Sequence, residues 1–342
     1  MRPPERITPP ETPASNGPEL VDRQGRRITY LRLAITDRCN LRCRYCRPEE
    51  GVPFIPHEEI LTLEELERLT VLFCSMGVIK VRVTGGEPFS RRGCITFLQR
   101  LRRIKGLTHL HVTTNGVKTA RFLDELARVP IDGLNLSLDT LDPDRFFRIT
   151  RRDYLDAVLQ TLYGTLEKKI PLKVNSVMLE DTSDEEIMRL VVLARELPLT
   201  LRFIETMPFS GRARNEKLVN GDLAGRLRAL LPDLREVEVD GPTTARLFSH
   251  PGFAGMVGVI QGHSRQFCTT CNKVRITPVG MLKTCLYDNG VLDLRALLRA
   301  GSGDAELREA VARCVRGRHA DGHETELHSR RSEEPSMGLI GG

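Results

Sequence analysis

The sequence predicts an α/β fold, an incomplete (β/α)6 barrel followed by a C-terminal region. Short segments with alternating apolar and polar residues recur between residues 31 and 205, and a period of two is typical of strands. Helical patterns separate them, which indicates parallel strands joined by right-handed crossovers. Each expected strand has one largely polar face, whereas covered parallel strands are apolar on both faces. A curved sheet with a polar lumen fits this pattern better than a packed (β/α)8 core.

Six segments carry the strand pattern, and the apolar residues of each share one face. The expected strands are 31–35, 80–84, 110–113, 134–139, 172–177 and 201–205. Two of the intervening helices begin with a capping box, in which a hydroxyl and a later glutamate satisfy each other's backbone N–H groups. Thr62 with Glu65 opens one helix, and Ser183 with Glu186 opens the other.

The flanking regions have different patterns. Residues 1–20 are rich in proline and polar residues, and we interpret them as a disordered leader. The partial barrel is expected at 21–235 and a C-terminal region with the second cysteine group at 236–330. Helices are expected at 221–231, 293–298 and 306–316, and residues 331–342 are expected to form a mobile tail.

Composition and charge limit the function classes. The net charge of +6, from 51 basic and 45 acidic residues, is mild, and tryptophan is absent. An anionic small molecule fits this charge, whereas an aromatic platform for nucleic acid is not indicated. The chain has neither a long apolar segment nor an N-terminal secretory signal. We therefore expect a cytoplasmic protein that binds neither membrane nor nucleic acid, with cysteines serving as metal ligands or redox groups.

Six of the nine cysteines form two groups of three. The first group follows the first expected strand with spacing Cys-x3-Cys-x2-Cys, and the second has spacing Cys-x2-Cys-x13-Cys. The groups are Cys39, Cys43 and Cys46, and Cys268, Cys271 and Cys285. A fully protein-ligated [4Fe-4S] cluster takes four cysteines, so each group would leave one iron open. The alternatives are a zinc site or free thiols at the first group, and zinc with His263 as a fourth ligand at the second group.

Several cations fall on the polar side of the expected strands. They are Arg32, Lys80, Arg82, Lys173 and Arg202. Burying unpaired cations is costly, so a ligand with several phosphates or carboxylates would neutralise them. The alternative is that they form ion pairs with Glu87, Asp139 and Glu205.

The first cysteine group resembles the motif of the radical S-adenosylmethionine superfamily. Tyr45 takes the usual aromatic position before the last cysteine, and Gly85-Gly86-Glu87-Pro88 ends the second expected strand. The resemblance implies that S-adenosylmethionine binds the open iron and that one electron then releases a 5′-deoxyadenosyl radical. The implied cofactor contacts are Tyr45, Gly85, Gly86, Glu87, Ser137 and Met207. Without the resemblance, Ser137 would be an ordinary strand serine and Met207 a packing residue.

The second cysteine group and longer runs resemble the GTP 3′,8-cyclase family of molybdenum cofactor biosynthesis. The similarity extends from about residue 20 to the last residue. It implies two [4Fe-4S] clusters and S-adenosylmethionine as cofactors, and GTP as substrate. The implied GTP contacts are Arg32, Arg82, Thr113, Lys173, Lys273 and Arg275, with Arg202 as a further candidate and Lys80 added by the strand pattern.

The same resemblance implies a reaction and partners. The radical would remove the 3′ hydrogen of GTP, and the ribose carbon would attack C8 of guanine. The product would be (8S)-3′,8-cyclo-7,8-dihydroguanosine 5′-triphosphate, which a cyclic pyranopterin monophosphate synthase would consume. A flavodoxin or ferredoxin would donate electrons, and the enzyme would be a homodimer. Gly341 and Gly342 resemble a mobile C-terminal tail that reaches into the catalytic site.

Three residues depart from the family pattern, and two other function classes stay open. Ala34 stands where serine is usual, Arg47 where methionine is usual and Lys273 where arginine is usual. Lysine keeps the charge but loses the bidentate fork. The alternatives are another radical enzyme with an auxiliary cluster, such as a peptide-modifying maturase, and a metal-dependent RNA-binding protein. The thiols that match no motif are expected to be buried or incidental: Cys74, Cys94 and Cys314.

Overall fold

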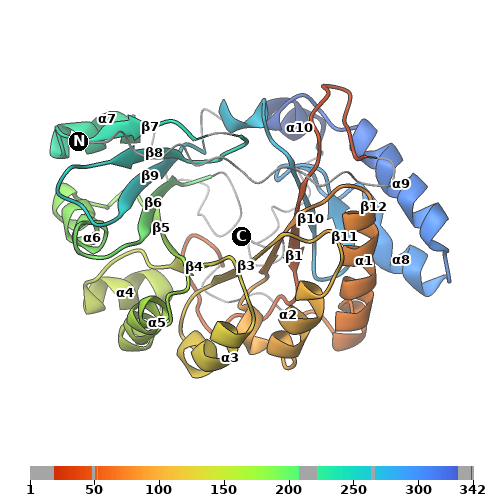
Figure 1. Ribbon diagram of the computed structural model, residues 1–342, viewed down its shortest axis with the longest axis horizontal. Helices are drawn as coiled ribbons and strands as arrows, with labels where there is room; N and C mark the ends of the chain where they lie inside the picture. The colour runs from red at the N-terminus through yellow and green to blue at the C-terminus, as the bar shows by residue number, and fades with distance from the viewer. Residues whose placement is uncertain are drawn as a thin grey trace.

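The structure is a computed structural model that describes residues 19–47, 51, 53–207, 222–239, 241–262, 266–329 and 340. Within them a 12-stranded sheet curves around a central space, with helices on its outer side (Figure 1). The strand order is β12-β11-β10-β1-β2-β3-β4-β5-β6-β9-β8-β7, with β12 and β7 at the edges. The prediction of an incomplete α/β barrel is confirmed. Most of the expected leader, together with His263, Gly341 and Gly342, lies outside the described residues.

The central strands β1 to β6 are parallel and agree with the expected segments to within about two residues. Their bounds are β1 Tyr30–Ala34, β2 Lys80–Thr84, β3 His109–Thr114, β4 Gly133–Ser137, β5 Leu172–Met178 and β6 Thr200–Glu205. Apolar side chains of these strands face the helices. Leu31, Val81, Phe73 of the first helix and Phe97 of the second are all 0% exposed. The core therefore lies between sheet and helices, which leaves the polar strand face to the interior of the barrel.

Helices between these strands cover the outer face of the sheet (Figure 1). Their bounds are α1 Leu63–Ser75, α2 Cys94–Arg102, α3 Leu123–Arg128, α4 Pro143–Thr150, α5 Leu155–Glu167 and α6 Asp184–Glu196. Both predicted capping boxes are confirmed, at the starts of α1 and α6. Short 3-10 turns lie at η1 His57–Glu59, η2 Pro88–Ser90, η3 Thr119–Phe122 and η4 Gln266–Cys268.

The C-terminal region extends the same sheet at both ends. At one end, β9 pairs in parallel with β6, and β8 and β7 follow; at the other, β10 pairs in parallel with β1, and β11 and β12 follow. These strands are β7 Arg235–Val237, β8 Arg246–Ser249, β9 Met256–Ile260, β10 Lys273–Ile276, β11 Met281–Lys283 and β12 Leu292–Asp293. Segments far apart in the sequence therefore line one interior.

Four helices accompany these strands: α7 Leu223–Leu230, α8 Leu294–Arg299, α9 Asp304–Arg316 and α10 Gly322–His328. The first three were predicted. The sequence analysis missed α10, where the Asp321 side chain accepts hydrogen bonds from the first backbone N–H groups. Among the described residues, no helix has the length and apolar character needed to cross a membrane.

Candidate active site

A single cavity of about 920 Å³ lies on the polar face of the sheet, and both cysteine groups line it. The pairing of β10 with β1 brings the second group to the same interior as the first, which follows β1 (Figure 1). The predicted cations line this cavity too, and so does Thr113. The predicted cations that line it are Arg32, Lys80, Arg82, Lys173, Arg202, Lys273 and Arg275, and further lining cations are Arg26, Arg27, Arg47, Lys283 and Arg318.

One layer of cations surrounds a tyrosine. The strand register sets Tyr30 between Lys273 and Lys80, whose Nζ atoms lie 5.8 and 5.1 Å from the ring centroid. Arg82 Nε–H donates to the tyrosine hydroxyl oxygen. Burial alone would raise the pKa of Tyr30, but Arg82, Arg32 and Lys80 outweigh it and lower the pKa to about 7. Tyr30 is therefore partly ionised at neutral pH and acts as a counter-charge inside the cavity.

The next layer consists of arginines. Arg32 lies between Arg275 and Arg82 in the register, and Arg82 Nη1 donates to Thr113 Oγ1 at 3.4 Å. Burial and Arg275 lower the pKa of Arg32 to about 9. A guanidinium stays protonated at neutral pH, so this layer remains cationic.

Two further cations come from β5 and β6. Arg202 Nε donates to Asn175 Oδ1 at 2.9 Å. Burial and Arg202 lower the pKa of Lys173 to about 8, while burial and Arg82 lower the pKa of Arg202 to about 9. Within the described part of the chain, neither cation pairs with a carboxylate. The site thus holds a concentrated positive charge that an anionic ligand would neutralise.

Glu87 points into the protein and is not part of the cavity lining. Its carboxylate is 0% exposed and accepts from Thr114 Oγ1 at 2.9 Å and from the Asn115 N–H at 2.7 Å. Burial raises its pKa to about 7. These bonds tie the turn after β2 to the end of β3. Glu87 is therefore not a partner of the cavity cations.

Gly85 and Gly86 do line the cavity, and both press against the loop that leads to the first cysteine group. A Cβ atom on Gly85 would lie 2.5 Å from the carbonyl oxygen of Thr36. A Cβ atom on Gly86 would lie 2.5 Å from the carbonyl oxygen of Arg38. The Gly86 N–H donates to the Thr36 oxygen at 2.7 Å. Only glycine fits these positions, so the turn fixes where the cysteine loop begins.

The first cysteine group has a neutral neighbour in Asn115, an acidic one in Asp139 and a cationic one in Arg47. Asn115 Nδ2 lies 3.5 Å from Cys39 Sγ, and the Cys46 N–H donates to the Cys43 carbonyl oxygen at 2.9 Å. Burial raises the pKa of Cys39 to about 11, and burial and Asp139 raise the pKa of Cys43. Thiolates formed here need a cation as partner, which bound iron supplies.

Asp139 and Tyr45 form a wall of the cavity beside this group. Tyr45 OH donates to Asp139 Oδ2 at 2.8 Å. Burial raises the pKa of Asp139 to about 6, and burial and Asp139 raise the pKa of Tyr45. Ser137 at the end of β4 and Met207 after β6 also line the cavity. The Asp139 carboxylate therefore gives this end of the cavity a negative charge at neutral pH, beside the cation of Arg47.

Cys271 of the second cysteine group has cationic neighbours, whereas burial, the two other thiols of the group and Asp321 raise the pKa of Cys268. Arg318 donates from Nη2 to Cys271 Sγ at 2.9 Å and from Nη1 to the Cys271 carbonyl oxygen at 2.8 Å. Burial opposes ionisation, but Arg318 and Lys273 outweigh it and lower the pKa of Cys271. Ile340 is buried against Met207 and Cys285, so the described C-terminal residue lies beside this group.

Donors of another kind gather near the second cysteine group. Among the described residues, His319, Glu324 and His328 each place one donor atom within 4.8 Å of the others. The cysteines of the two groups do not form such a set.

Some residues of the site were missed by the sequence analysis. Tyr30 is two residues from Arg32 on β1 and shares its face, so the period-two pattern contained the signal. Asn115 and Arg318 contact cysteine sulfurs. Asn115 lies in the run 113–116 that resembles the family but was given no role, and Arg318 lies outside the recognised motifs. Cys74 and Cys94 are buried as expected, while Cys314 is half-buried.

Family models and solved structures agree with this architecture. The model described as "Radical SAM superfamily" matches residues 33–194, and "Molybdenum Cofactor Synthesis C" matches residues 199–324. The chain is similar to the crystal structure of Streptococcus suis SuiB bound to precursor peptide SuiA, with a TM-score of 0.57 and 17% sequence identity. The match covers 92% of this chain and 71% of the SuiB chain. SuiB bound to S-adenosylmethionine has a TM-score of 0.54 at 17% identity, covering 82% and 66%. These likenesses show the fold alone, and with the family match they define a radical S-adenosylmethionine protein.

Curated relatives narrow the class. The chain is 42% identical to "Molybdenum cofactor biosynthesis protein 1" of Bos taurus over 86% of its length and 47% of that protein. It is 36% identical to "GTP 3',8-cyclase" of Clostridium perfringens, covering 94% of this chain and 100% of that one. The chain thus spans about half the length of the first of these relatives and all of the second. It belongs to the GTP 3′,8-cyclase family.

Proposed function

We propose that this chain converts GTP to (8S)-3′,8-cyclo-7,8-dihydroguanosine 5′-triphosphate, the first step of molybdenum cofactor biosynthesis. The observation that carries the proposal is the charge polarity of one cavity of about 920 Å³. Its end beside the first cysteine group has the Asp139 carboxylate with Arg47, whereas the cations of β1, β2, β5, β6 and β10 make the rest strongly basic. S-adenosylmethionine brings a sulfonium and an ammonium, whereas GTP brings a triphosphate. Each ligand therefore has an electrostatically matched end of the cavity.

The first cysteine group would hold one [4Fe-4S] cluster and S-adenosylmethionine, which together supply the one-electron chemistry that abstracts a hydrogen atom. Tyr45, held by Asp139, would form a wall beside the cofactor. Ser137 and Met207 would contact it from the strand ends, and the backbone of the Gly85–Gly86 turn would approach its amino group. The buried Glu87 carboxylate would act by holding this turn rather than by direct contact.

The basic end would bind the triphosphate of GTP. Arg82 already donates to Thr113, and both would reach the same anion. Lys273 and Arg275 on β10 would connect it to the second cysteine group, which would hold another [4Fe-4S] cluster beside the guanine. The other cations proposed as triphosphate contacts are Arg32, Lys80, Lys173 and Arg202.

The C-terminal Gly341 and Gly342 are proposed to reach into the site and assist cyclisation. Support comes from the preceding Ile340, which is 2% exposed and packs with Tyr287 and Met207 beside the second cysteine group. Deleting both glycines should leave the iron content unchanged and abolish cyclisation. Unchanged turnover of the shortened chain would refute this role.

The assignment is tested by anaerobic turnover. The protein is reconstituted with iron and sulfide and given a reductant, S-adenosylmethionine and GTP. We expect about eight irons per chain from two clusters, release of 5′-deoxyadenosine and a cyclised nucleotide by mass spectrometry. ATP in place of GTP serves as control. Protein that holds both clusters and cleaves S-adenosylmethionine but gives no GTP-dependent product would refute the proposal.

We also propose a flavodoxin or ferredoxin as electron donor. A smaller cavity joins Cys39 to Arg42, Arg47 and Arg152, which suits an acidic redox protein docking near the first cluster. A homodimer, a cytoplasmic location and a downstream cyclic pyranopterin monophosphate synthase stay predictions from the family. Sedimentation of the reconstituted protein tests the first of these.

A further inference from the structure

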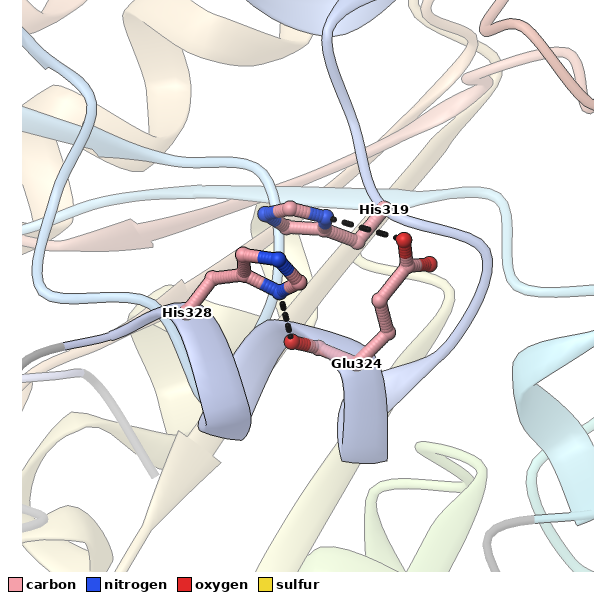
Figure 2. Close-up of side chains that lie close together, drawn as sticks. All are labelled: His319, Glu324 and His328. Carbon is pink, nitrogen blue, oxygen red and sulfur yellow. Dashed lines mark hydrogen bonds and ion pairs between the residues drawn. The ribbon is translucent and has the colours of Figure 1, made fainter.

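Three donor side chains meet beside the second cysteine group, outside the proposed cyclase chemistry (Figure 2). They are His319, Glu324 and His328, and one donor atom of each lies within 4.8 Å of the others. Figure 2 shows Glu324 and His328 on α10, with His319 on the segment before it. Helix residues four apart share a face, so α10 presents a carboxylate and an imidazole together toward the third donor.

Hydrogen bonds define which ring nitrogens carry protons. His328 Nδ1 lies 2.8 Å from the Glu324 carbonyl oxygen, which only accepts, so Nδ1 carries the hydrogen and Nε2 keeps a lone pair. A metal-ligating histidine usually donates its other nitrogen to a carbonyl or carboxylate, as His328 does here. His319 Nδ1 lies 3.5 Å from Glu324 Oε1, so in the neutral ring this nitrogen offers its lone pair on the side of the carboxylate. The rings stack with centroids 4.7 Å apart and planes 18° apart, an arrangement that two protonated rings would oppose.

Backbone contacts hold the donors in place. Glu324 Oε2 accepts from the Ala320 N–H at 2.7 Å. Arg26 Nη2 donates to the His319 carbonyl oxygen at 2.6 Å, and Arg26 Nη1 donates to the Cys268 carbonyl oxygen at 2.8 Å. The donor cluster and the second cysteine group therefore share one supporting guanidinium. A ligand that fixes the donors would also restrain the loop behind the cysteines.

We propose that His319, Glu324 and His328 bind one zinc-class divalent cation, which joins α10 to the segment directly before it. Two imidazoles and a carboxylate form a donor set that zinc takes with a water in the fourth position. Magnesium and calcium prefer oxygen donors. Zn–N bonds of about 2.1 Å place ligands roughly 3.4 Å apart, so a pair at the 4.8 Å limit would close by roughly 1.4 Å. His328 is exposed and ends α10, so its ring has room to turn.

The test measures zinc on the full, tag-free chain after anaerobic reconstitution, so that iron occupies the cysteine groups. The protein is equilibrated with micromolar zinc chloride and millimolar magnesium, desalted and analysed for zinc and iron by mass spectrometry. We expect about one zinc per chain, lost in His319→Ala and His328→Ala. His323→Ala is the matched control, because His323 is an exposed histidine of α10 outside the donor cluster.

Each outcome is decisive. Glu324→Gln should weaken zinc binding about 10- to 100-fold in a calorimetric titration. Zinc retained in both histidine variants, or absent from the wild-type chain, overturns the proposal. The three side chains would then only form hydrogen bonds at the start of α10. His328→Ala alters an exposed side chain, so this variant tests the site even if His319→Ala fails to fold. Zinc content is measured without GTP, so its result is independent of the proposed cyclisation.

Discussion

Each cysteine group offers three sulfurs, but Cys43 of the first group and Cys271 of the second have opposite surroundings. At the first group, burial and Asp139 raise the pKa of Cys43, and the nearest polar wall is the Tyr45–Asp139 pair. At the second, Arg318 donates to Cys271 and lowers its pKa together with Lys273. Ligand count alone thus does not define a cluster's role. The neighbouring charges decide whether its open iron lies next to a cationic or an anionic ligand.

The largest effect should come from removing one thiol from each group. Cys43→Ala should abolish cleavage of S-adenosylmethionine, because the first cluster binds it. Cys271→Ala should keep some uncoupled release of 5′-deoxyadenosine while losing the cyclised product. Chromatography of both products checks this, with Cys314→Ala as control because this thiol lies outside both groups. Equal loss of 5′-deoxyadenosine in both variants would remove the distinction between the groups.

A smaller effect is expected at the basic end. Arg82 is 4% exposed and reaches Tyr30 and Thr113. Arg82→Ala removes the charge-assisted contact of this guanidinium with the triphosphate. The loss should cost about 2 kcal/mol of binding free energy, or about thirtyfold in GTP affinity. Binding of S-adenosylmethionine should not change. Calorimetry on cluster-loaded protein measures both affinities, with a variant at an exposed arginine, Arg92→Ala, as control. An equal loss of affinity for S-adenosylmethionine would contradict the binding of the two ligands at separate ends of the cavity.

The pH dependence of GTP binding tests the counter-charge at Tyr30. Its pKa is about 7 without ligand, and a bound triphosphate would raise it by repelling the phenolate. Binding therefore takes up a proton, and affinity should fall by up to about tenfold per pH unit above 7. Lys173, with a pKa of about 8, loses its charge at higher pH and acts in the same direction.

Tyr30→Phe should flatten this profile between pH 7 and 8 and leave the Lys173 slope above it. Tyr163→Phe is the matched control, because Tyr163 is an exposed tyrosine on α5. Titrations of GTP at several pH values provide the measurement. A Tyr30→Phe profile as steep as that of the wild-type chain would show that Tyr30 stays protonated in the free site.

The smallest expected effect is a change in the reduction potential of the second cluster alone. Hydrogen bonds to cluster sulfur help set its reduction potential, and Arg318 donates one to Cys271. Arg318→Met should lower the potential of the second cluster by tens of millivolts and leave the first cluster unchanged. A redox titration followed by electron paramagnetic resonance checks this, with exposed Arg316→Met as control. Equal shifts in both clusters would point to a general change in the fold.

Local patterns were enough to predict much of this molecule. The alternation of apolar and polar residues predicted the central strands. It also predicted that Arg32, Arg82 and Lys173 lie on the inner face of the sheet, because strand geometry fixes which side chains share a face. The pairing of β10 with β1 was not predictable, since parallel pairing of distant segments leaves no local signature. The sequence analysis likewise could not show that Glu87 turns away from the cavity. Such orientations depend on hydrogen bonds made only in the folded chain.

The central claim is that the two ends of one cavity, one beside each cysteine group, hold S-adenosylmethionine and GTP at the same time. Turnover of GTP deuterated at C3′, with mass analysis of the released 5′-deoxyadenosine, tests it most directly. Hydrogen transfer requires both ligands within contact distance, so we predict deuterium in 5′-deoxyadenosine together with cyclised nucleotide. Cyclised product accompanied by unlabelled 5′-deoxyadenosine would contradict the account.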